Sequence, residues 1–586
     1  MEKIKRFLLI TIILIIPVGI SIFIEKFIYP NAIFDLKRAG FVIWYLYVIF
    51  FIVYRYEEEN IKISKRNVTK IIFSILISFI VFISKKNIYF FIMGSLEVLL
   101  IFFISNLIEK KWKYIGQTIN DIVLLLYNIQ SAILILANTF ITRTMISNLV
   151  YIEDLMGNFT LYISSALIII AVSLIPIKKT KISYKSEIAC IIVIASIYVY
   201  SCVFFGYNNS VMYGYADLIE QEYIYRSELH TIKKTANKED FYREEINDYR
   251  KKARDIPEKP NIIIIFTEGL STLPIEDERN IMCYTREYES KSLSFENYYN
   301  HTFATNHALI GQLYSGFQYD NFENNKLVSI QEIFKDNGYR TSFINVEPIN
   351  LEFKNYLKEF KFTDFIEPTE EIDGNGDTYS DKVAYETLYN TAIELEKEED
   401  PFMLAMYTVG THISFDGIYN EYGDGFNKIL NKFYDMDIQF GEFMDKFNRS
   451  ELAENTIIVF TADHGSVAEV EYKTIFENHN RNHYGLDKIP FFIYYKGMKP
   501  ERIDARCRTS IDFAPTVLDY LDITAPNYFL GESLFSGPHD EELEHFYRDD
   551  SGCAKIYDDT VYLLTPKEEK DIKKKILRYF SISADR

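Results

Sequence analysis

Two apolar segments far apart in the chain end in side chains of the kinds that bind divalent metals. Residues 456–460 lead into Asp463 and His464, and residues 261–266 lead into Glu268. Carboxylate oxygens and imidazole nitrogens together suit hard or borderline divalent ions. Both segments are typical of buried β-strands, and open α/β sheets place their ligands at the carboxyl ends of strands. We therefore expect these side chains to meet at one edge of a sheet as candidate metal ligands.

A hydroxyl-rich segment at residues 302–307 lies between the two strands in the sequence and offers a candidate nucleophile. Its two threonines are Thr302 and Thr305. Thr305 precedes a helix-like stretch, and the N-terminus of a helix stabilises an anionic phosphoryl group. We therefore favour Thr305 over Thr302. The alternative role for Thr305 is that of an ordinary helix cap.

From residue 260 onward, short apolar runs alternate with helical patterns. This alternation predicts a mostly parallel sheet with helices on both faces. The expected strands are 261–266, 340–345, 402–407, 456–461 and 489–495. The expected helices lie near 305–316, 328–337, 380–397, 425–449 and 510–522. The tail predicts short strands at about 544–565 and a charged helix at 566–578.

The first 206 residues of the 586-residue chain have a different composition from the rest. A helix that crosses a bilayer needs roughly 20 apolar residues, and several apolar runs approach or reach that length. The runs at 41–55 and 121–141 are the weakest, and the alternative for them is a pair of interfacial helices. We expect about seven spans, with five as the alternative. The runs lie at about 6–24, 41–55, 69–84, 88–108, 121–141, 160–177 and 187–206.

Charge is distributed unevenly along the chain. Most Lys and Arg residues of the first 206 residues fall in loops on one side of the expected membrane, which the positive-inside rule makes the cytoplasmic side. An odd number of spans then places everything after about residue 206 outside the cytoplasm. The net charge of the chain is −19 and its acidic excess lies in that later part. We therefore expect a multi-pass protein of the cell membrane without a nucleic acid partner.

Several motifs follow one another in order between residue 260 and about residue 540. In that order they resemble the alkaline phosphatase/sulfatase superfamily, and within it the membrane-anchored lipoteichoic acid synthases and phosphoethanolamine transferases. The resemblance implies a multi-span α-helical membrane domain followed by an α/β sulfatase-like (alkaline-phosphatase-like) extracytoplasmic domain with a mostly parallel central sheet. The motifs are the strand ending at Glu268, then Thr305, Gly410-Thr411-His412, Asp463-His464-Gly465, Asp512-x-x-Pro515-Thr516 and Gly531-x-x-Leu534-Phe535.

The resemblance also implies roles for single residues. Glu268, Thr305, Asp463 and His464 match the metal ligands of the superfamily, and Thr305 matches its nucleophile. His412 matches a histidine that contacts the phosphate or the leaving group, whereas a loop hydrogen bond is its alternative role. The site would hold one divalent metal ion, for which we favour manganese over zinc.

Two further histidines, His479 and His483, precede the apolar strand at 488–493. Some members of the superfamily use a histidine near this place to bind substrate phosphate or a second metal. We expect His483 to bind substrate, and the alternative is a solvated loop histidine.

Departures from the superfamily pattern bear on the reaction. The sequence lacks the Cys/Ser-x-Pro-x-Arg motif that sulfatases need, which disfavours hydrolysis of sulfate esters. No cysteine flanks Thr305, unlike in phosphoethanolamine transferases, and residues 350–354 lack the Trp-x-Arg pair of lipoteichoic acid synthases. The absence of flanking cysteines favours phosphoglycerol over phosphoethanolamine as the transferred group.

The resemblance therefore implies a transferase that moves phosphoglycerol, or phosphoethanolamine, from a phospholipid donor to an envelope glycan or glycolipid through a phosphothreonine at Thr305. One alternative is a phosphodiesterase or phosphatase of the same fold. The other is a non-catalytic membrane protein with a degenerate ectodomain. We divide the chain into a transmembrane domain at 1–206, a helical juxtamembrane connector at 207–258 and a sulfatase-like catalytic domain at 259–586.

Overall fold

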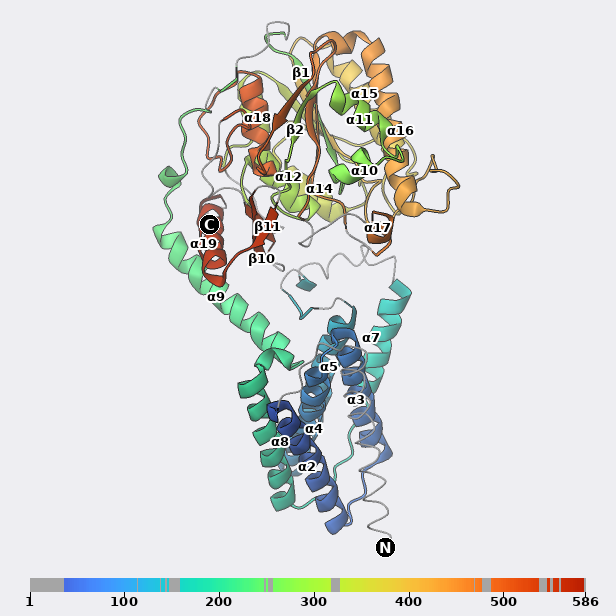
Figure 1. Cartoon of the computed structure of the whole chain (residues 1–586), viewed down its shortest axis with the longest axis vertical. Helices are drawn as coiled ribbons and strands as arrows, with labels where there is room; N and C mark the ends of the chain where they lie inside the picture. The colour runs from blue at the N-terminus through green and yellow to red at the C-terminus, as the bar shows by residue number, and fades with distance from the viewer. Residues whose placement is uncertain are drawn as a thin grey trace. The chain divides into compact units, whose positions relative to one another are not determined.

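The computed structural model divides the chain into two compact units, Met1–Tyr225 and Arg226–Arg586. Figure 1 shows helices throughout the first unit and a sheet with helices in the second. The structure describes residues 36–112, 114–136, 139–142, 145–146, 159–246, 249–250, 257–317, 327–467, 470–476, 486–536, 545–548, 552–557 and 560–583.

Apolar helices build the first unit. Within the described residues, four of its helices are long and apolar enough to cross a membrane: Lys65–Lys85, Ile88–Lys111, Ile115–Leu136 and Tyr184–Val203. The expected run at 6–24 lies outside the described residues. The helices of this part are α2 (Leu36–Glu58), α3 (Lys65–Lys85), α4 (Ile88–Lys111), α5 (Ile115–Leu136), α7 (Phe159–Ser173) and α8 (Tyr184–Phe205). The boundary between the two units falls within α9 (Tyr213–Thr235).

Buried polar pairs join these helices to one another. Lys70 Nζ on α3 lies 2.5 Å from Asp121 Oδ1 on α5. Lys110 on α4 forms an ion pair with Glu187 on α8. A buried charge is tolerated when an opposite charge or hydrogen bonds compensate it, so each pair favours one register of its two helices.

The second unit contains an eight-stranded sheet in the order β4-β3-β5-β1-β6-β7-β2-β8. The four pairings from β4 through β6 are parallel, whereas β7 runs antiparallel to β6 and to β2. The prediction of a mostly parallel sheet is therefore confirmed. The strands are β1 (Asn261–Thr267), β2 (Leu293–Glu296), β3 (Arg340–Ile344), β4 (Asp364–Ile366), β5 (Phe402–Tyr407), β6 (Thr456–Ala462), β7 (Phe491–Tyr494) and β8 (Glu501–Asp504).

Helices cover this sheet on both faces, with α18 on one side and α15 and α16 on the other in Figure 1. The five helices and the tail elements expected from the sequence are present. The helices are α10 (Thr272–Glu276), α11 (Cys283–Ser290), α12 (Thr305–Tyr314), α13 (Ile330–Asp336), α14 (Leu351–Lys358), α15 (Asp381–Leu395), α16 (Lys428–Arg449), α17 (Val470–Ile475), α18 (Phe513–Tyr520) and α19 (Pro566–Ser583). A small antiparallel sheet joins β9 (His545–Arg548), β10 (Gly552–Tyr557) and β11 (Thr560–Leu563).

The central strand β1 shows how the sheet positions the candidate metal ligands. Its residues 262–266 are fully buried, as a continuous apolar run covered on both faces must be. β1 pairs in parallel with β6 so that Thr267 lies opposite Ala462. The residues that follow this last pair are Glu268 and Asp463. The register of two buried strands therefore brings two carboxylates to the same edge.

Replacing Ile264 in β1 with alanine tests the contribution of this core. Ile264 is completely buried, and removing a buried isoleucine side chain down to alanine costs about 2–5 kcal/mol in free energy of unfolding. The same change at Ile219, whose side chain is 70% exposed, is expected to cost less than about 0.5 kcal/mol. Urea unfolding of the purified full chain measures both values. Equal losses in the two variants would contradict the assignment of β1 to the core.

Candidate active site

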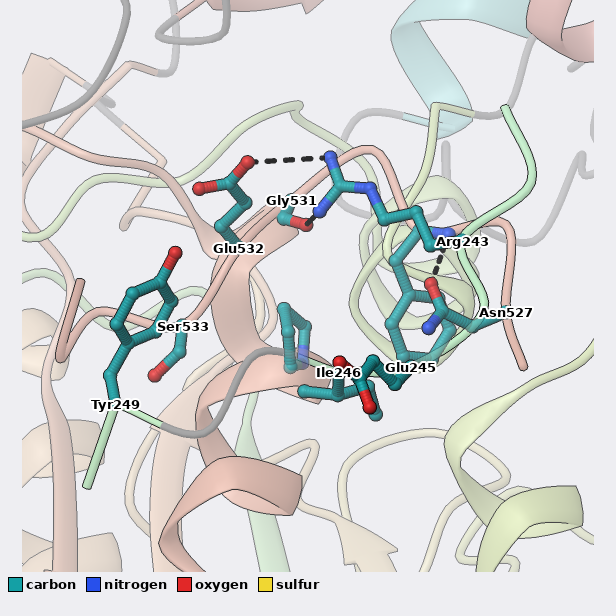
Figure 2. Close-up of a pocket in the computed structure, with 10 residues that line it drawn as sticks. Arg243, Glu245, Ile246, Tyr249, Asn527, Gly531, Glu532 and Ser533 are labelled. Atoms are coloured by element: carbon teal, nitrogen blue, oxygen red, sulfur yellow. Dashed lines mark hydrogen bonds and ion pairs between the residues drawn. The ribbon is translucent and has the colours of Figure 1, made fainter. Parts of the chain in front are cut away.

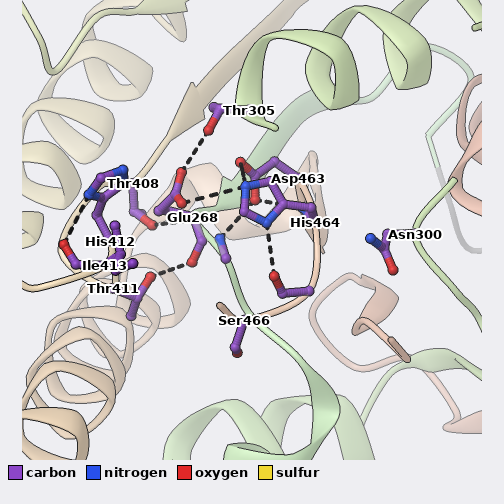
Figure 3. Close-up of polar contacts among 12 residues, drawn as sticks. Glu268, Asn300, Thr305, Thr408, Thr411, His412, Ile413, Asp463, His464 and Ser466 are labelled. Carbon is purple, nitrogen blue, oxygen red and sulfur yellow. Dashed lines mark hydrogen bonds and ion pairs between the residues drawn. The ribbon is translucent and has the colours of Figure 1, made fainter. Parts of the chain in front are cut away.

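Three predicted metal ligands converge at the carboxyl ends of β1 and β6 (Figure 3). Glu268, Asp463 and His464 each offer one ligand atom, and these atoms lie within 4.8 Å of one another. His464 Nε2 is 3.6 Å from Glu268 Oε1 and 3.5 Å from Asp463 Oδ2. All three side chains are buried. Two buried carboxylates beside one imidazole nitrogen form a donor set that suits a divalent cation.

Hydrogen bonds around this group orient the ligand atoms inward. Asp463 Oδ1 accepts the backbone N–H groups of Gly269, at 2.8 Å, and of His464, at 2.6 Å. Asp463 Oδ2 is buried and has no hydrogen-bond partner among the described residues. His464 Nδ1 lies 2.9 Å from the carbonyl oxygen of Gly465, which fixes the proton on Nδ1 and leaves the lone pair on Nε2. The residues therefore fit a bound metal ion.

Electrostatics support the same conclusion. Burial raises the pKa of the Asp463 carboxyl to about 7, and the neighbouring negative charge of Glu268 adds to the rise. Without a cation, the protein stabilises the protonated form of Asp463. A divalent ion held by this group would offset the rise in pKa, because its positive charge would favour the ionised forms of both carboxylates.

The candidate nucleophile Thr305 lies at the start of α12 and contacts this group. Its Oγ1 donates a hydrogen bond of 3.0 Å to Glu268 Oε2. Two hydrogen bonds connect the same helix to the end of β6. Gln312 Nε2 donates to the carbonyl oxygens of Ala462 and Asp463 at 3.1 Å each. Thr302, the alternative nucleophile, is buried. The hydroxyl of Thr305 therefore meets the metal ligands at a helix N-terminus, where an anion is stabilised.

The residue before the candidate nucleophile is strained. Ala304 has φ 127° and ψ 128° and carries no side chain that can cap α12. A residue with a Cβ rarely adopts a positive φ, and such strain costs about 1–3 kcal/mol and gathers at functional sites. The strained peptide turns the chain sharply into the helix that begins with Thr305.

The loop after β5 carries His412 and forms hydrogen bonds with the backbone of Glu268. Thr411 Oγ1 donates a hydrogen bond to the carbonyl oxygen of Glu268. Thr408 Oγ1 accepts the backbone N–H of Glu268 at 3.3 Å. His412 is half-buried, and its Nδ1 lies 3.2 Å from the carbonyl oxygen of Ile413. It was not predicted from the sequence that the two threonines bind the backbone of Glu268. The signal that could have shown it is the occurrence of two hydroxyl residues within four positions of the end of β5.

Two buried charged residues form hydrogen bonds with the backbone of the same loop. Asp381 Oδ1 accepts the backbone N–H groups of Val409 and Gly410 at 3.3 and 3.0 Å. Lys432 Nζ donates to the carbonyl oxygen of His412 at 3.1 Å. Sequence reasoning missed both residues, because each lies inside a helix-like pattern where a charged residue is ordinarily solvated.

A pair of serines joins the two loops that carry the candidate metal ligands. The backbone N–H of Ser271 donates to Ser466 Oγ, and the N–H of Ser466 donates to Ser271 Oγ, each at 2.9 Å. Ser271 Oγ also donates to Asp487 Oδ2 at 2.5 Å. This reciprocal contact was not predicted, although both serines follow a predicted metal ligand within three residues. The predicted substrate contact His483 lies outside the described residues, as does His479.

A surface pocket elsewhere in the second unit lies between the segment around Arg243 and the loop before Glu532 (Figure 2). Arg243 Nη1 donates to the carbonyl oxygen of Gly531 at 3.1 Å, and Arg243 Nη2 lies 3.6 Å from Glu532 Oε1. None of the predicted site residues lines this pocket. The arginine is already satisfied by these contacts, so the pocket does not compete with the metal-ligand group as the candidate site.

Comparison with known proteins gives one family match. Residues 260–523 match the model of the sulfatase family. An ulvan-active sulfatase of Formosa agariphila is 26% identical over 120 residues, which cover 20% of this chain and 19% of that protein. The chain thus spans less than a fifth of this curated relative.

Two solved structures are similar to part of the chain. One is a protein of the alkaline phosphatase superfamily from Vibrio parahaemolyticus, with a TM-score of 0.47, 18% identity and coverage of 59% of this chain and 90% of that one. The other is the lipoteichoic acid synthase LtaP from Listeria monocytogenes, with a TM-score of 0.45, 19% identity and coverage of 57% and 96%.

The raised pKa of Asp463 predicts a pH-dependent effect of metal on stability. Because this pKa rises from 3.8 to about 7 in the metal-free folded protein, the folded state holds a proton that the unfolded chain releases. Stability of the metal-free protein therefore falls as pH rises between these values. We expect the gain in Tm on adding MnCl2 to be larger at about pH 8 than at about pH 5.5. The Asp463→Asn variant should show little gain at either pH, and an equal gain in both proteins would contradict the site.

The strain at Ala304 predicts opposite effects for two substitutions. Ala304→Gly relieves the positive φ and is expected to keep or raise Tm, whereas Ala304→Val adds a β-branch at the strained position and lowers the free energy of unfolding by about 1–3 kcal/mol. Thermal unfolding followed by circular dichroism measures both. A lower Tm for the glycine variant than for the valine variant would show that the backbone at Ala304 is relaxed.

Proposed function

We propose that the sulfatase-family domain formed by residues 260–523 is a metal-dependent phosphotransferase. It moves a phosphoglycerol group, or a phosphoethanolamine group, from a phospholipid to a cell-envelope glycan or glycolipid. The observation that carries this proposal is the contact of Thr305 Oγ1 with Glu268 at 3.0 Å, at the start of α12 and beside the buried ligands Asp463 and His464. A nucleophile, metal ligands and a helix N-terminus meet there.

Glu268, Asp463 and His464 would hold the divalent ion, which would lower the pKa of the Thr305 hydroxyl and polarise a phosphoryl oxygen. We favour manganese, with zinc as the alternative. The donor set of two carboxylates and one imidazole suits both ions. Thr305 completes this set in the proposal, as both ligand and nucleophile.

In the first half-reaction Thr305 Oγ1 forms a bond to phosphorus, and the bond from phosphorus to the diacylglycerol oxygen breaks. Glu268 Oε2 accepts the hydrogen bond of this hydroxyl at 3.0 Å and takes its proton as the new bond forms. The N-terminus of α12 stabilises the negative phosphoryl group. His412 gives a proton to the leaving diacylglycerol oxygen. The product is a phosphothreonine ester on Thr305.

In the second half-reaction a hydroxyl of the acceptor attacks the phosphorus, the bond to Thr305 Oγ1 breaks, and the proton held by Glu268 returns to Oγ1. The proton of the acceptor hydroxyl passes to His412, which restores the histidine for the next cycle. The loop that carries His412 is held by Thr411 and Asp381. We propose that these contacts keep the imidazole on the leaving-group side of the phosphorus.

The chemistry of the nucleophile favours phosphoryl transfer over sulfate-ester hydrolysis. The sequence contains no Cys/Ser-x-Pro-x-Arg motif, whereas Thr305 offers an unmodified hydroxyl. The four helices able to cross a membrane support a lipid donor. We propose that the chain is a multi-pass protein of the cell membrane, with the catalytic domain on the extracytoplasmic side as the basic loops indicate. In this proposal residues 1–206 form the membrane domain, residues 207–258 the connector and residues 259–586 the catalytic domain.

Mass spectrometry of the purified full chain tests the covalent step. After incubation with MnCl2 and mixed phospholipids, we expect an added mass on the peptide that contains Thr305. The adduct should be absent from Thr305→Ala and present in Thr302→Ala, which controls for the neighbouring threonine. Its size distinguishes phosphoglycerol from phosphoethanolamine. An adduct on Thr302 instead would overturn the assignment of the nucleophile.

Product analysis separates transfer from hydrolysis. With labelled phospholipid and a glycolipid acceptor, a transferase moves the label onto the acceptor, whereas a hydrolase releases it as a free phosphate ester with or without the acceptor. Label that appears only in the free ester would replace the transferase with a phosphodiesterase.

A further inference from the structure

Exposed apolar side chains gather in three loops of the second unit. These loops follow β3, β4 and β5. Phe426 is the most exposed of them, at 89%. We refer to this group as the apolar rim, which consists of Ile349, Ile372, Ile418, Tyr419 and Phe426.

The apolar rim lies at the edge of the sheet that carries the candidate site. The strands β3, β4, β5, β1 and β6 are parallel neighbours, so their carboxyl ends lie at one edge. Glu268 follows β1 and Asp463 follows β6 at this edge. His412 and the rim residues Ile418, Tyr419 and Phe426 share the loop after β5. The exposed apolar group therefore lies at the same edge of the sheet as the candidate site.

Hydrogen bonds join the three loops into one surface. The backbone N–H of Tyr379 donates to the carbonyl oxygen of Val346 at 2.9 Å, which links the loops after β4 and β3. Asn375 Nδ2 donates to the carbonyl oxygen of Asp416 at 2.9 Å, and the hydroxyl of Tyr419 donates to Asp373. These contacts link the loops after β4 and β5. Single exposed apolar residues need no explanation, whereas a joined group marks an interaction surface.

Phe426 is held in its exposed position by its neighbours. Gly423 and Gly425 adopt positive φ values of 64° and 76°, which turn the chain tightly before it. The backbone N–H of Phe426 donates to Asp424 Oδ1 at 3.2 Å. Asn427, the next residue, caps α16 by accepting the N–H of Leu430 at 3.1 Å. The loop therefore presents the aromatic ring outward from a fixed base.

We propose that the apolar rim inserts into the surface of a phospholipid bilayer and brings the site to the head group of its donor. This inference rests on the proposed lipid donor and adds the surface that captures it. Four helices among the described residues are long and apolar enough to cross a membrane, and such spans would tether the second unit to a bilayer. Aromatic and aliphatic side chains presented together on one surface are the groups that enter the interface of a membrane.

The charges beside the rim define the kind of bilayer. Glu421 and Asp424 lie in the same loop as Phe426, and Glu370 and Glu371 precede Ile372. The basic groups beside them are Lys382, whose Nζ lies 4.7 Å from the centre of the Tyr419 ring, and Lys428 at the start of α16. Acidic side chains outnumber basic ones here, so an anionic surface gains no attraction. The contact is therefore apolar, and it does not depend on an anionic lipid surface.

Photo-crosslinking in the full chain tests the contact. A benzophenone amino acid replaces Phe426 in a Thr305→Ala background, and the protein is reconstituted into phosphatidylcholine vesicles. Tyr562, 48% exposed on the small sheet, takes the same probe as a control. We expect a phospholipid adduct at position 426 and none at 562. No lipid adduct at 426, equal adducts at both positions, or a protein adduct at 426 would overturn the proposal.

Two further readouts separate this inference from the proposed function. Replacing half of the phosphatidylcholine with phosphatidylglycerol should not increase crosslinking at position 426, and an increase would show an electrostatic contact instead. In the active protein, Phe426→Ser should raise KM for vesicle-bound donor about tenfold, the lower end of the effect of losing a buried phenylalanine, at an unchanged Tm. Crosslinking without any transferase activity would refute the proposed function and leave the membrane contact in place.

Discussion

The structure of the second unit depends on two buried carboxylates that face one another beside a single imidazole. Glu268 and Asp463 follow paired residues of adjacent buried strands, so neither can move away without breaking the sheet. Two carboxylates in a buried space repel each other, and burial alone disfavours their charged forms. Only a proton or a cation relieves that cost. A divalent ion provides the larger relief above neutral pH.

Several surrounding contacts make sense as consequences of this constraint. Thr411 and Thr408 hold the backbone of Glu268, while Ser271 and Ser466 join the two loops that follow β1 and β6. Each contact fixes main-chain atoms next to a ligand, and none uses the ligand oxygen that faces His464. The fold therefore keeps an electrostatically costly arrangement in place through hydrogen bonds outside it. The strained backbone at Ala304 belongs to the same pattern, because local strain persists where the surroundings determine the conformation.

The sequence allowed prediction of those features of the site that a single residue or a single strand determines. The strands at 261–266 and 456–461 are continuous apolar runs, and such runs indicate buried parallel strands without further information. β2, β4 and β8 were missed because each has only three or four residues, and β8 is largely polar. Asp381 and Lys432 were missed for another reason. Their partners lie 28 or 29 and 20 positions away, and no local pattern distinguishes a buried charge from a solvated one on a helix.

The parallel sheet also explains why a polar candidate active site and an apolar surface occur at the same edge. The loops that follow parallel strands all lie at one edge of the sheet. The sequence of each loop can nevertheless change without changing the strands. The described residues that directly follow β1 and β6, 268–271 and 463–466, are buried, and they supply the candidate metal ligands. The loops after β3, β4 and β5 carry exposed apolar side chains. A lipid donor needs both environments, because its phosphoryl group is charged while the rest of the molecule stays in the bilayer. The topology of one sheet is sufficient to place them next to each other.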